Sequence, residues 1–212
     1  GCCRYIVGHC DPDVDQAVKD GIDDNLSLMG SGTNPWEGEL AALMVKHIPS
    51  VDKAMFANSG SEVTYAAIRL ARSYTGRKGV ILMQGGYNGW HNDVAYNIMN
   101  SVDQIGPYVS PGEYPLKPIT AGIPDNILQN IHVINYNDLD SVELMIKNFD
   151  IAAIILEPIL QNIGIVKPQP GYLEGLRNIC DRQGVVLIFD EVKTGFRHAL
   201  GGYQSICGVL PD

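Results

Sequence analysis

The chain has 212 residues, of which 45% are hydrophobic and 18% charged, a composition typical of one globular domain with a sizeable core. Its 15 basic and 24 acidic residues give a net charge of −9, which argues against a nucleic-acid partner because such a partner requires a basic surface. No apolar run reaches the length of a membrane span, so we expect a cytoplasmic protein with no membrane partner.

The five cysteines show no repeated spacing and their number is odd. Cys2, Cys3, His9 and Cys10 lie close together in the sequence, as metal ligands do. No second half of a zinc motif follows them. We therefore expect no metal, and reduced cysteines as in cytosolic proteins.

Short apolar runs alternate with stretches of helical periodicity along the chain. The alternation predicts an α/β fold with three layers and a mostly parallel, mixed sheet, formed by residues 1–212 as one domain. A long segment rich in Pro and Gly, 100–130, is expected to cover the active site or to fill a dimer interface. The expected strands are 53–58, 79–84, 131–135, 151–157 and 185–190, and the expected helices are 36–48, 61–75, 138–148 and 171–183.

A phosphate-binding loop is predicted where the run ending at Asn58 meets the helix 61–75. Ser59 or Ser61 can cap this helix, and Gly60 lets a ligand approach the backbone closely. The free amide groups at a helix start attract an anion. An ordinary capped helix is the structural alternative.

The segment after the strand 79–84 places glycines around aromatic residues, as a flat ligand requires. Tyr87 is the expected stacking face, and a Gly-rich turn with a buried Tyr is the alternative. The strand 151–157 also ends in an acid, Glu157. Pro158 then stops the strand, and Asn162 lies on the loop that follows.

The last strand, 185–190, runs directly into Asp190. Ligands of open α/β sheets bind at the carboxyl ends of the strands, so this carboxylate is expected to face a crevice. A pyridoxal 5′-phosphate (PLP) site needs an acid beside the pyridinium nitrogen, and Asp190 is the candidate. Capping of the next turn is the structural alternative.

Taken together, these segments resemble the class III PLP-dependent aminotransferases of fold type I. Asn58–Glu62 resembles the phosphate loop of that family, and Phe189–Val192 with Thr194–Arg197 resembles the strand that meets the cofactor nitrogen. Within the class, Asn162 and the stretch 168–177 are similar to the branch of the glutamate-1-semialdehyde 2,1-aminomutases.

The resemblance implies a role for each matching position. Ser59, Gly60 and Ser61 would bind the cofactor phosphate, and Asp190 would pair with the ring nitrogen. Tyr87 and Val192 would contact the two faces of the cofactor ring, and Asn88 would lie beside the ring. Glu157 and Asn162 would form the floor of the site near the ring's substituents. Ser31 and Gly32 would face the substrate or a neighbouring subunit. The family also implies a homodimer that acts on a small-molecule amino donor and a carbonyl acceptor.

Two positions depart from the family pattern. Asn88 stands where relatives usually carry His, and it can donate a hydrogen bond but cannot take part in proton transfer. Lys193 stands where relatives carry Gln or Met. It is either an exposed loop lysine or a residue that tunes or replaces the cofactor lysine.

No lysine of the chain matches the position of the family's Schiff-base lysine, which follows the segment that resembles Gly208–Asp212. We expect the 212 residues to be an incomplete large domain, without the small domain, that does not complete a transamination by itself. The alternatives are a non-catalytic domain that binds PLP or supports assembly, and an aminotransferase module of a larger synthase. The amino donor and acceptor stay open, as does the choice between aminotransferase and aminomutase.

Overall fold

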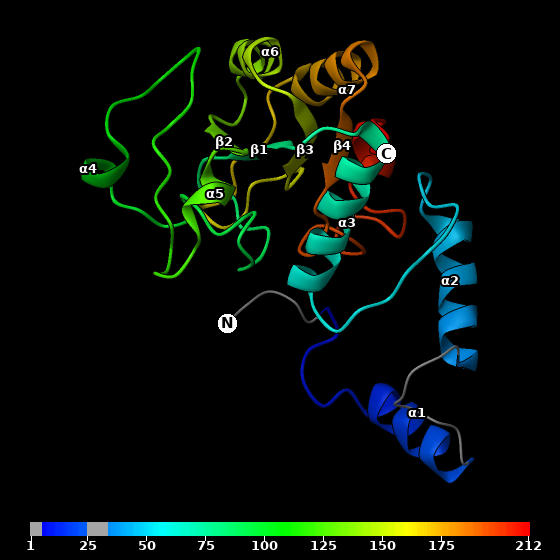
Figure 1. Cartoon of the computed structure of the whole chain (residues 1–212). Coiled ribbons are helices and arrows are strands. Elements are labelled where there is room, and N and C mark those ends of the chain that lie inside the picture. The colour runs from blue at the N-terminus through cyan, green and yellow to red at the C-terminus, as the bar shows by residue number, and fades with distance from the viewer. Residues whose placement is uncertain (1–5, 25–33) are drawn as a thin grey trace.

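The computed structural model describes residues 6–24 and 34–212, and its centre is a parallel β-sheet (Figure 1). The strands stand in the order β2-β1-β3-β4, and every ladder between them is parallel. Their bounds are β1 Gly79–Met83, β2 Ile131–Ile134, β3 Ile151–Leu156 and β4 Val186–Phe189. The predicted strands at these four places are confirmed, and an isolated antiparallel bridge between Tyr114 and Val133 of β2 adds to the parallel ladders at this edge of the sheet.

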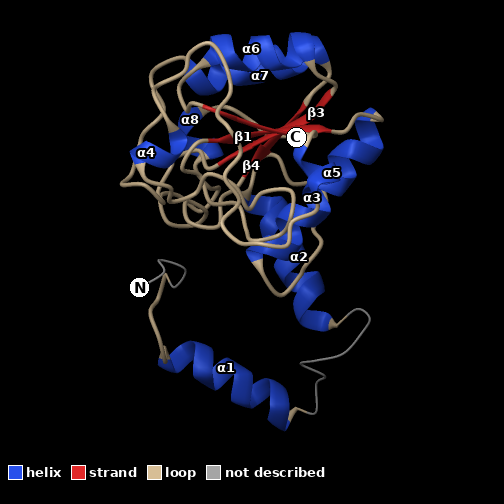
Figure 2. Ribbon diagram, turned by 60° about the vertical axis from the view of Figure 1, so that its left-hand side comes forward, coloured by secondary structure: helices blue, strands red, loops and turns tan. Residues whose placement is uncertain are grey.

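Helices cover both faces of the sheet, which gives the three expected layers. Figures 1 and 2 show α6 and α7 together on one face, and Figure 1 shows α3 on the other. The long helices are α1 Pro12–Asp23, α2 Pro35–His47, α3 Gly60–Thr75, α6 Leu139–Asn148 and α7 Tyr172–Gln183, and the short ones are α4 Val102–Ile105, α5 Asp125–Leu128 and α8 Gln204–Cys207.

Two apolar clusters hold the layers together. The first lies between the sheet and α6 and α7, and it includes Ile154, Leu176 and Leu187, all fully buried. The second lies on the opposite face, where Ile68 of α3 packs near Val80 and Val133 of the sheet. Strand residues are therefore buried on both sides, which is why β1, β2 and β3 read as continuous apolar runs in the sequence.

The order of the strands reverses direction at β1. The chain passes from β1 to β2 on one side of the sheet, then returns to place β3 on the other side of β1. In an open parallel sheet such a reversal opens a crevice at the carboxyl ends of the two inner strands. The loops that follow β1 and β3 emerge at this edge, where the N–H of Tyr87 donates to Glu157.

The prediction of a strand at 53–58 is wrong. These residues are extended but join no ladder, and the side chain of Met55 is 69% exposed. A strand needs a neighbour that accepts and donates its backbone hydrogen bonds. No described strand lies beside 53–58, so its apolar pattern alone does not make it part of the sheet.

The segment 100–130 is more ordered than its composition suggested. It contains α4 and α5, and its apolar side chains, among them Leu116 and Ile127, pack on the second cluster. The backbone of Tyr114 also pairs with Val133 of β2. The segment therefore covers part of the sheet face, and its two expected roles, over the active site or in a dimer interface, stay predictions.

Helices α1 and α2 lie away from the sheet (Figure 1), and the sequence predicted only one of them. α2 was expected. α1 was not, although Asp11 caps it by accepting from the N–H groups of Asp13 and Val14, with Pro12 at its first position. Among the described residues, no helix has both the length and the apolar character needed to cross a bilayer.

We predict that Leu176→Ala lowers the free energy of unfolding by about 2–5 kcal/mol, because it leaves a cavity between α7 and the sheet. Met99, which is 82% exposed, supplies the control, and Met99→Ala is expected to change stability by at most about 0.5 kcal/mol. Urea unfolding followed by circular dichroism measures both. Equal losses in the two variants would contradict the packing described here.

Candidate functional site

Four segments meet at the carboxyl edge of the sheet. They are the loop after β1 with Tyr87 and Asn88, the loop after β3 with Glu157, the loop after β4 with Asp190, and the start of α3. Hydrogen bonds join the first loop to each of the other three segments. The candidate site is therefore one connected structure at the carboxyl edge of the sheet, where the strand order reverses.

Asp190 lies at the end of β4 with only 7% of its surface exposed. Its Oδ2 accepts from Asn88 Nδ2 at 2.9 Å, and its Oδ1 accepts from the N–H of Val192 at 3.0 Å. Burial raises the pKa of this carboxyl above its usual range, while these two donors and the nearby charge of Lys193 act in the opposite direction. Asp190 is thus a buried acid that a cationic partner would stabilise in its ionised form.

Glu157 is a second buried acid, 3% exposed, and it directly follows β3. Its Oε1 accepts from the N–H of Tyr87 at 3.1 Å and its Oε2 from the N–H of Gln161 at 3.3 Å. Burial raises the pKa of Glu157, and the charge of Asp190 adds to that increase. The carboxylate therefore fixes the backbone beside Tyr87.

Lys193 is half-buried and close to both acids. Its positive charge lowers the pKa of Glu157 and of Asp190. The residue is therefore neither fully exposed nor fully buried. Its position agrees with an electrostatic influence on the site.

The start of α3 is the candidate anion cradle, and the structure shows it as a capped helix start. Ser59 is the N-cap, and its Oγ accepts from the N–H of Glu62 at 3.3 Å, while the Glu62 carboxylate accepts from the N–H of Asn58 at 2.7 Å. The first N–H groups of a helix have no helical acceptor and point outward. A Cβ at Gly60 would lie 3.1 Å from Cγ2 of Val192, so the cradle and the turn after Asp190 are in close contact.

Ser61 joins the cradle to the loop after β1 instead of capping the helix. Its Oγ accepts from the N–H of Trp90 at 3.2 Å. Gly89 has a φ of +123°, and a Cβ there would lie 2.9 Å from this same Oγ. Only glycine allows the two backbones to approach so closely.

The expected ring-face residues keep surface that a ligand can cover. Tyr87 is 38% exposed and Val192 is 48% exposed. Asn162 is half-buried, and its Nδ2 donates to the carbonyl groups of Gly85 and Ile98 at 3.4 Å each. The side chain of Asn162 therefore fastens its own loop to the loop after β1.

Some sequence expectations cannot be placed in space. Ser31 and Gly32 lie outside the described residues, as do Cys2 and Cys3 of the cysteine cluster. Within residues 6–24 and 34–212, no three His, Cys, Asp or Glu side chains group together as metal ligands do.

The structure brings two further residues to the site that the sequence did not single out. Thr64 lies on the buried side of α3, in line with Ile68 and Ala71, and its hydroxyl bonds to the loop after β1. His91 lies against that hydroxyl. A polar residue within the inward-facing stripe of a helix was the available signal for Thr64.

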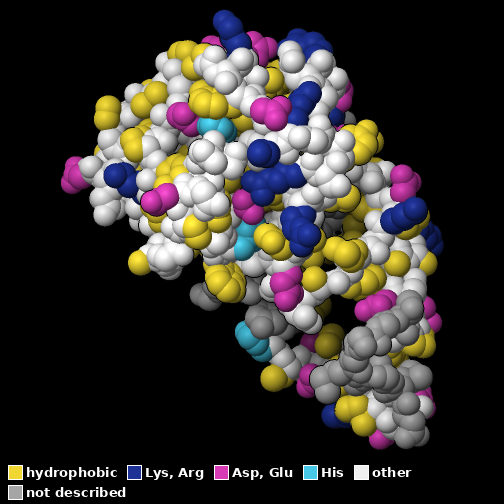
Figure 3. Space-filling view, in the orientation of Figure 1, with side chains coloured by type: hydrophobic (Ala, Val, Ile, Leu, Met, Phe, Trp, Pro, Cys, Tyr) yellow, Lys and Arg dark blue, Asp and Glu magenta, His cyan; other side chains and the backbone are white. Residues whose placement is uncertain are grey.

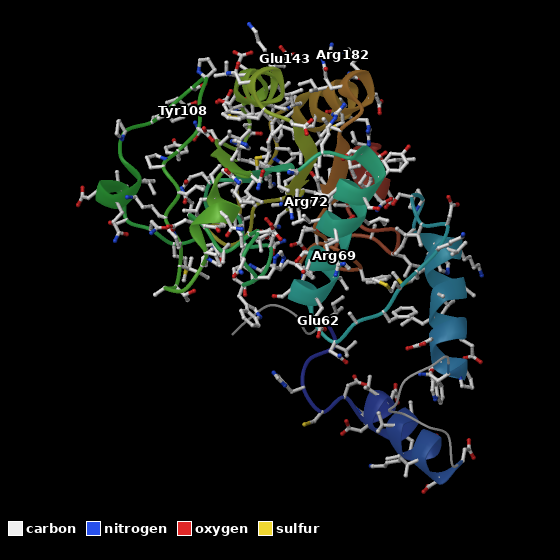
Figure 4. The ribbon with its side chains drawn as sticks, viewed as in Figure 1. Glu62, Arg69, Arg72, Tyr108, Glu143 and Arg182 are labelled. Carbon is white, nitrogen blue, oxygen red and sulfur yellow. The ribbon has the colours of Figure 1, made fainter. Side chains whose placement is uncertain are left out.

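Charged side chains are concentrated on the outward side of α3. Figure 3 shows Lys and Arg side chains gathered over this part of the surface, and Figure 4 labels Arg69 and Arg72 along the helix and Glu62 at its start. Arg72 pairs with Asp93 at 2.9 Å. The salt bridge fastens the last turn of α3 to the loop after β1.

Comparison with known proteins places the chain. All of residues 1–212 match the family described as Aminotransferase class-III. The chain belongs to this family. Similar curated proteins include the glutamate-1-semialdehyde 2,1-aminomutase of Syntrophobacter fumaroxidans, 44% identical over 98% of the chain, and that of Syntrophomonas wolfei, 42% identical over 98%. The chain covers 46% of each of them, so it spans about half the length of these relatives.

Solved structures agree with this assignment. An omega-transaminase from Sphaerobacter thermophilus superposes with a TM-score of 0.89 and 33% identity, over 99% of the chain and 47% of that protein. A transaminase with PLP bound superposes with a TM-score of 0.82 and 28% identity, over 99% of the chain and 47% of that protein. The α/β fold predicted from the sequence is that of these transaminases.

We predict that the contribution of Glu157 to stability is lost as the pH rises above about 4, the ordinary pKa range of a glutamate side chain. Burial raises the pKa of Glu157 in the folded chain above its value in the unfolded chain. Between these two pKa values the folded chain binds more protons than the unfolded chain, so the stability contributed by Glu157 falls as the pH rises. Glu157→Gln removes this contribution. Urea unfolding between about pH 4 and 8 should show a shallower decline in the variant, and parallel profiles would contradict the prediction.

Proposed function

We propose that this chain forms the cofactor-binding part of a PLP-dependent enzyme that transfers amino groups, an aminotransferase or a glutamate-1-semialdehyde 2,1-aminomutase. The observation that carries the proposal is the position of Asp190. This buried acid is held by two donors, and its turn touches the anion cradle at the start of α3 through Val192. An acid for a ring nitrogen and a cradle for a phosphate thus lie within one crevice.

The residues present suit the chemistry of PLP. Asp190 lacks a cationic partner in hydrogen-bond contact among the described side chains, and the pyridinium nitrogen would supply one. The helix start at Gly60 offers N–H donors for a phosphate. The exposed parts of Tyr87 and Val192 provide apolar surface for the two faces of a flat ring.

Each side chain has a separate task in this proposal. Bound PLP supplies an electron sink for bonds at the substrate's amine-bearing carbon. Asp190 keeps the ring nitrogen protonated, and Ser59 and Ser61 bind the phosphate. Glu157 holds the backbone of Tyr87 in place and, with Asn162, forms the floor of the crevice. No residue described here is assigned to the proton transfer between the substrate and the cofactor.

We propose small amines and carbonyl compounds as substrates, a homodimer as the assembly and the cytoplasm as the location. The dimer is supported by α1, where Val14, Val18 and Ile22 recur every fourth residue and are about half exposed. An exposed apolar stripe of this kind is typical of a protein interface. Light scattering tests the assembly, and the mass of a single copy at all concentrations would contradict a dimer.

We predict that Asp190→Asn weakens binding of pyridoxamine 5′-phosphate by about tenfold to a hundredfold, the contribution of a hydrogen bond to a charged group. Pyridoxamine 5′-phosphate is the suitable probe because it binds without a Schiff-base lysine. Isothermal titration of the 212-residue chain measures the affinity. Asp138→Asn is the control, because Asp138 is equally buried but caps α6 through Ser141 and bonds to no residue assigned to the cofactor.

The proposal would be wrong if the parent chain did not bind the probe. It would also be wrong if Asp138→Asn weakened binding as much as Asp190→Asn, since the effect would then reflect a general loss of structure.

We also predict that borohydride reduction of the chain with PLP traps no stoichiometric adduct at Lys193. Nucleophilic lysines are desolvated in apolar pockets or placed beside other cations, and no lysine among the described residues is buried. Mass spectrometry after reduction locates any adduct. A stoichiometric adduct that Lys193→Ala removes would assign the attachment role to Lys193.

A further inference from the structure

One hydroxyl lies between the two halves of the candidate site. Thr64 is 5% exposed and stands one turn into α3. Its Oγ1 lies 2.7 Å from the carbonyl oxygen of Asn88, and 3.0 Å and 3.2 Å from the carbonyl oxygens of Gly60 and Ser61. A hydroxyl has a single proton to donate, and the shortest of these contacts is the one to Asn88.

A histidine completes the arrangement from the other side. His91 Nε2 lies 3.2 Å from Thr64 Oγ1, and the N–H of Asp93 donates to His91 Nδ1 at 3.4 Å. Since Nδ1 accepts, a neutral ring carries its proton on Nε2, and Nε2 donates to Thr64. Burial lowers the pKa of His91, which favours this neutral form. Thr64 therefore accepts from His91 and donates to Asn88.

Asn88 carries the connection to the acid. Its carbonyl group is bound by Thr64, and its side-chain Nδ2 donates to Asp190 Oδ2 at 2.9 Å. Asn88 is 5% exposed, so its amide has little freedom to bond elsewhere. The backbone position that Thr64 fixes thus determines where the Asn88 side chain reaches Asp190.

We propose that Thr64 is a positioning residue of the cofactor site: its hydroxyl fastens the helix of the phosphate cradle to the backbone of Asn88, and Asn88 then orients Asp190. This inference rests on the proposed function, because it assigns the cradle and the acid to one ligand. Thr64 itself does not touch the ligand. Its hydroxyl sets the spacing between the group that binds the phosphate and the group that binds the ring nitrogen.

The test compares Thr64→Val, which keeps the shape but removes the hydroxyl, with Thr64→Ser, which retains it. Thr75→Val is the matched control, because the Thr75 hydroxyl also bonds to the carbonyl four residues earlier in α3, at 2.8 Å, but at the far end of the helix. Titration with pyridoxamine 5′-phosphate should give an affinity about tenfold weaker for Thr64→Val. The affinities of Thr64→Ser and Thr75→Val should stay within about threefold of that of the parent chain, which is a smaller change than the loss of one hydrogen bond would cause.

A second readout does not depend on the ligand. NMR of the Asp190 carboxyl carbon across a pH series should show a higher pKa in Thr64→Val, because the displaced Asn88 no longer donates to it. The other groups that act on Asp190, the charges of Glu191, Lys193 and Glu157, are unchanged in all the variants. Thr64→Ser and Thr75→Val should titrate like the parent chain.

The outcomes separate the inference from the proposed function. If the parent chain does not bind the probe, the proposed function fails and the Asp190 titration alone decides the role of Thr64. An unchanged titration in Thr64→Val, or an effect no larger than that of Thr75→Val, overturns the inference. If Thr64→Val does not fold, Thr64→Ala, which also lacks the hydroxyl, replaces it in the comparison with Thr64→Ser and Thr75→Val.

Discussion

The structure depends on the two parallel ladders that flank β1. Ile81 stands opposite His132 of β2 on one side and Ile154 of β3 on the other. Gly79 lets β3 approach, since a Cβ there would lie 2.8 Å from Cδ1 of Ile151. Because the chain leaves β1 in one direction and returns in the other, the strand ends on both sides open into the same crevice. The loops that carry the site residues are placed by this reversal.

Buried charge is the main electrostatic cost of the site. Glu157 and Asp190 are both removed from water, and each has backbone or amide donors in place of a cation in direct contact. Burial accordingly raises the pKa of both acids. In an enzyme of this family a cationic ring nitrogen would offset the cost at Asp190. Under the proposed function, the stability of the chain and its affinity for the cofactor would be linked through the same carboxyl group.

Sequence reasoning succeeded where a segment's role is local. Apolar runs gave β1 to β4 within two residues, and Ser59 marked a helix start that the structure contains. It failed at 53–58, because a ladder depends on a neighbour that local pattern cannot reveal. Asn88 was expected beside the ring, but its bond to Asp190 joins residues 102 positions apart and follows only from the sheet order.

The sequence by itself determined the family, the alternation of helices and strands, and the acids at the strand ends, because each is written in a short run of residues. The tertiary structure alone decided which of these residues act together. The sequence shows Thr64 only as a polar residue in the inward-facing stripe of its helix, and the contact with Asn88 forms when α3 packs beside the loop after β1. Such contacts depend on how the elements pack in three dimensions, and no local pattern in the chain encodes them.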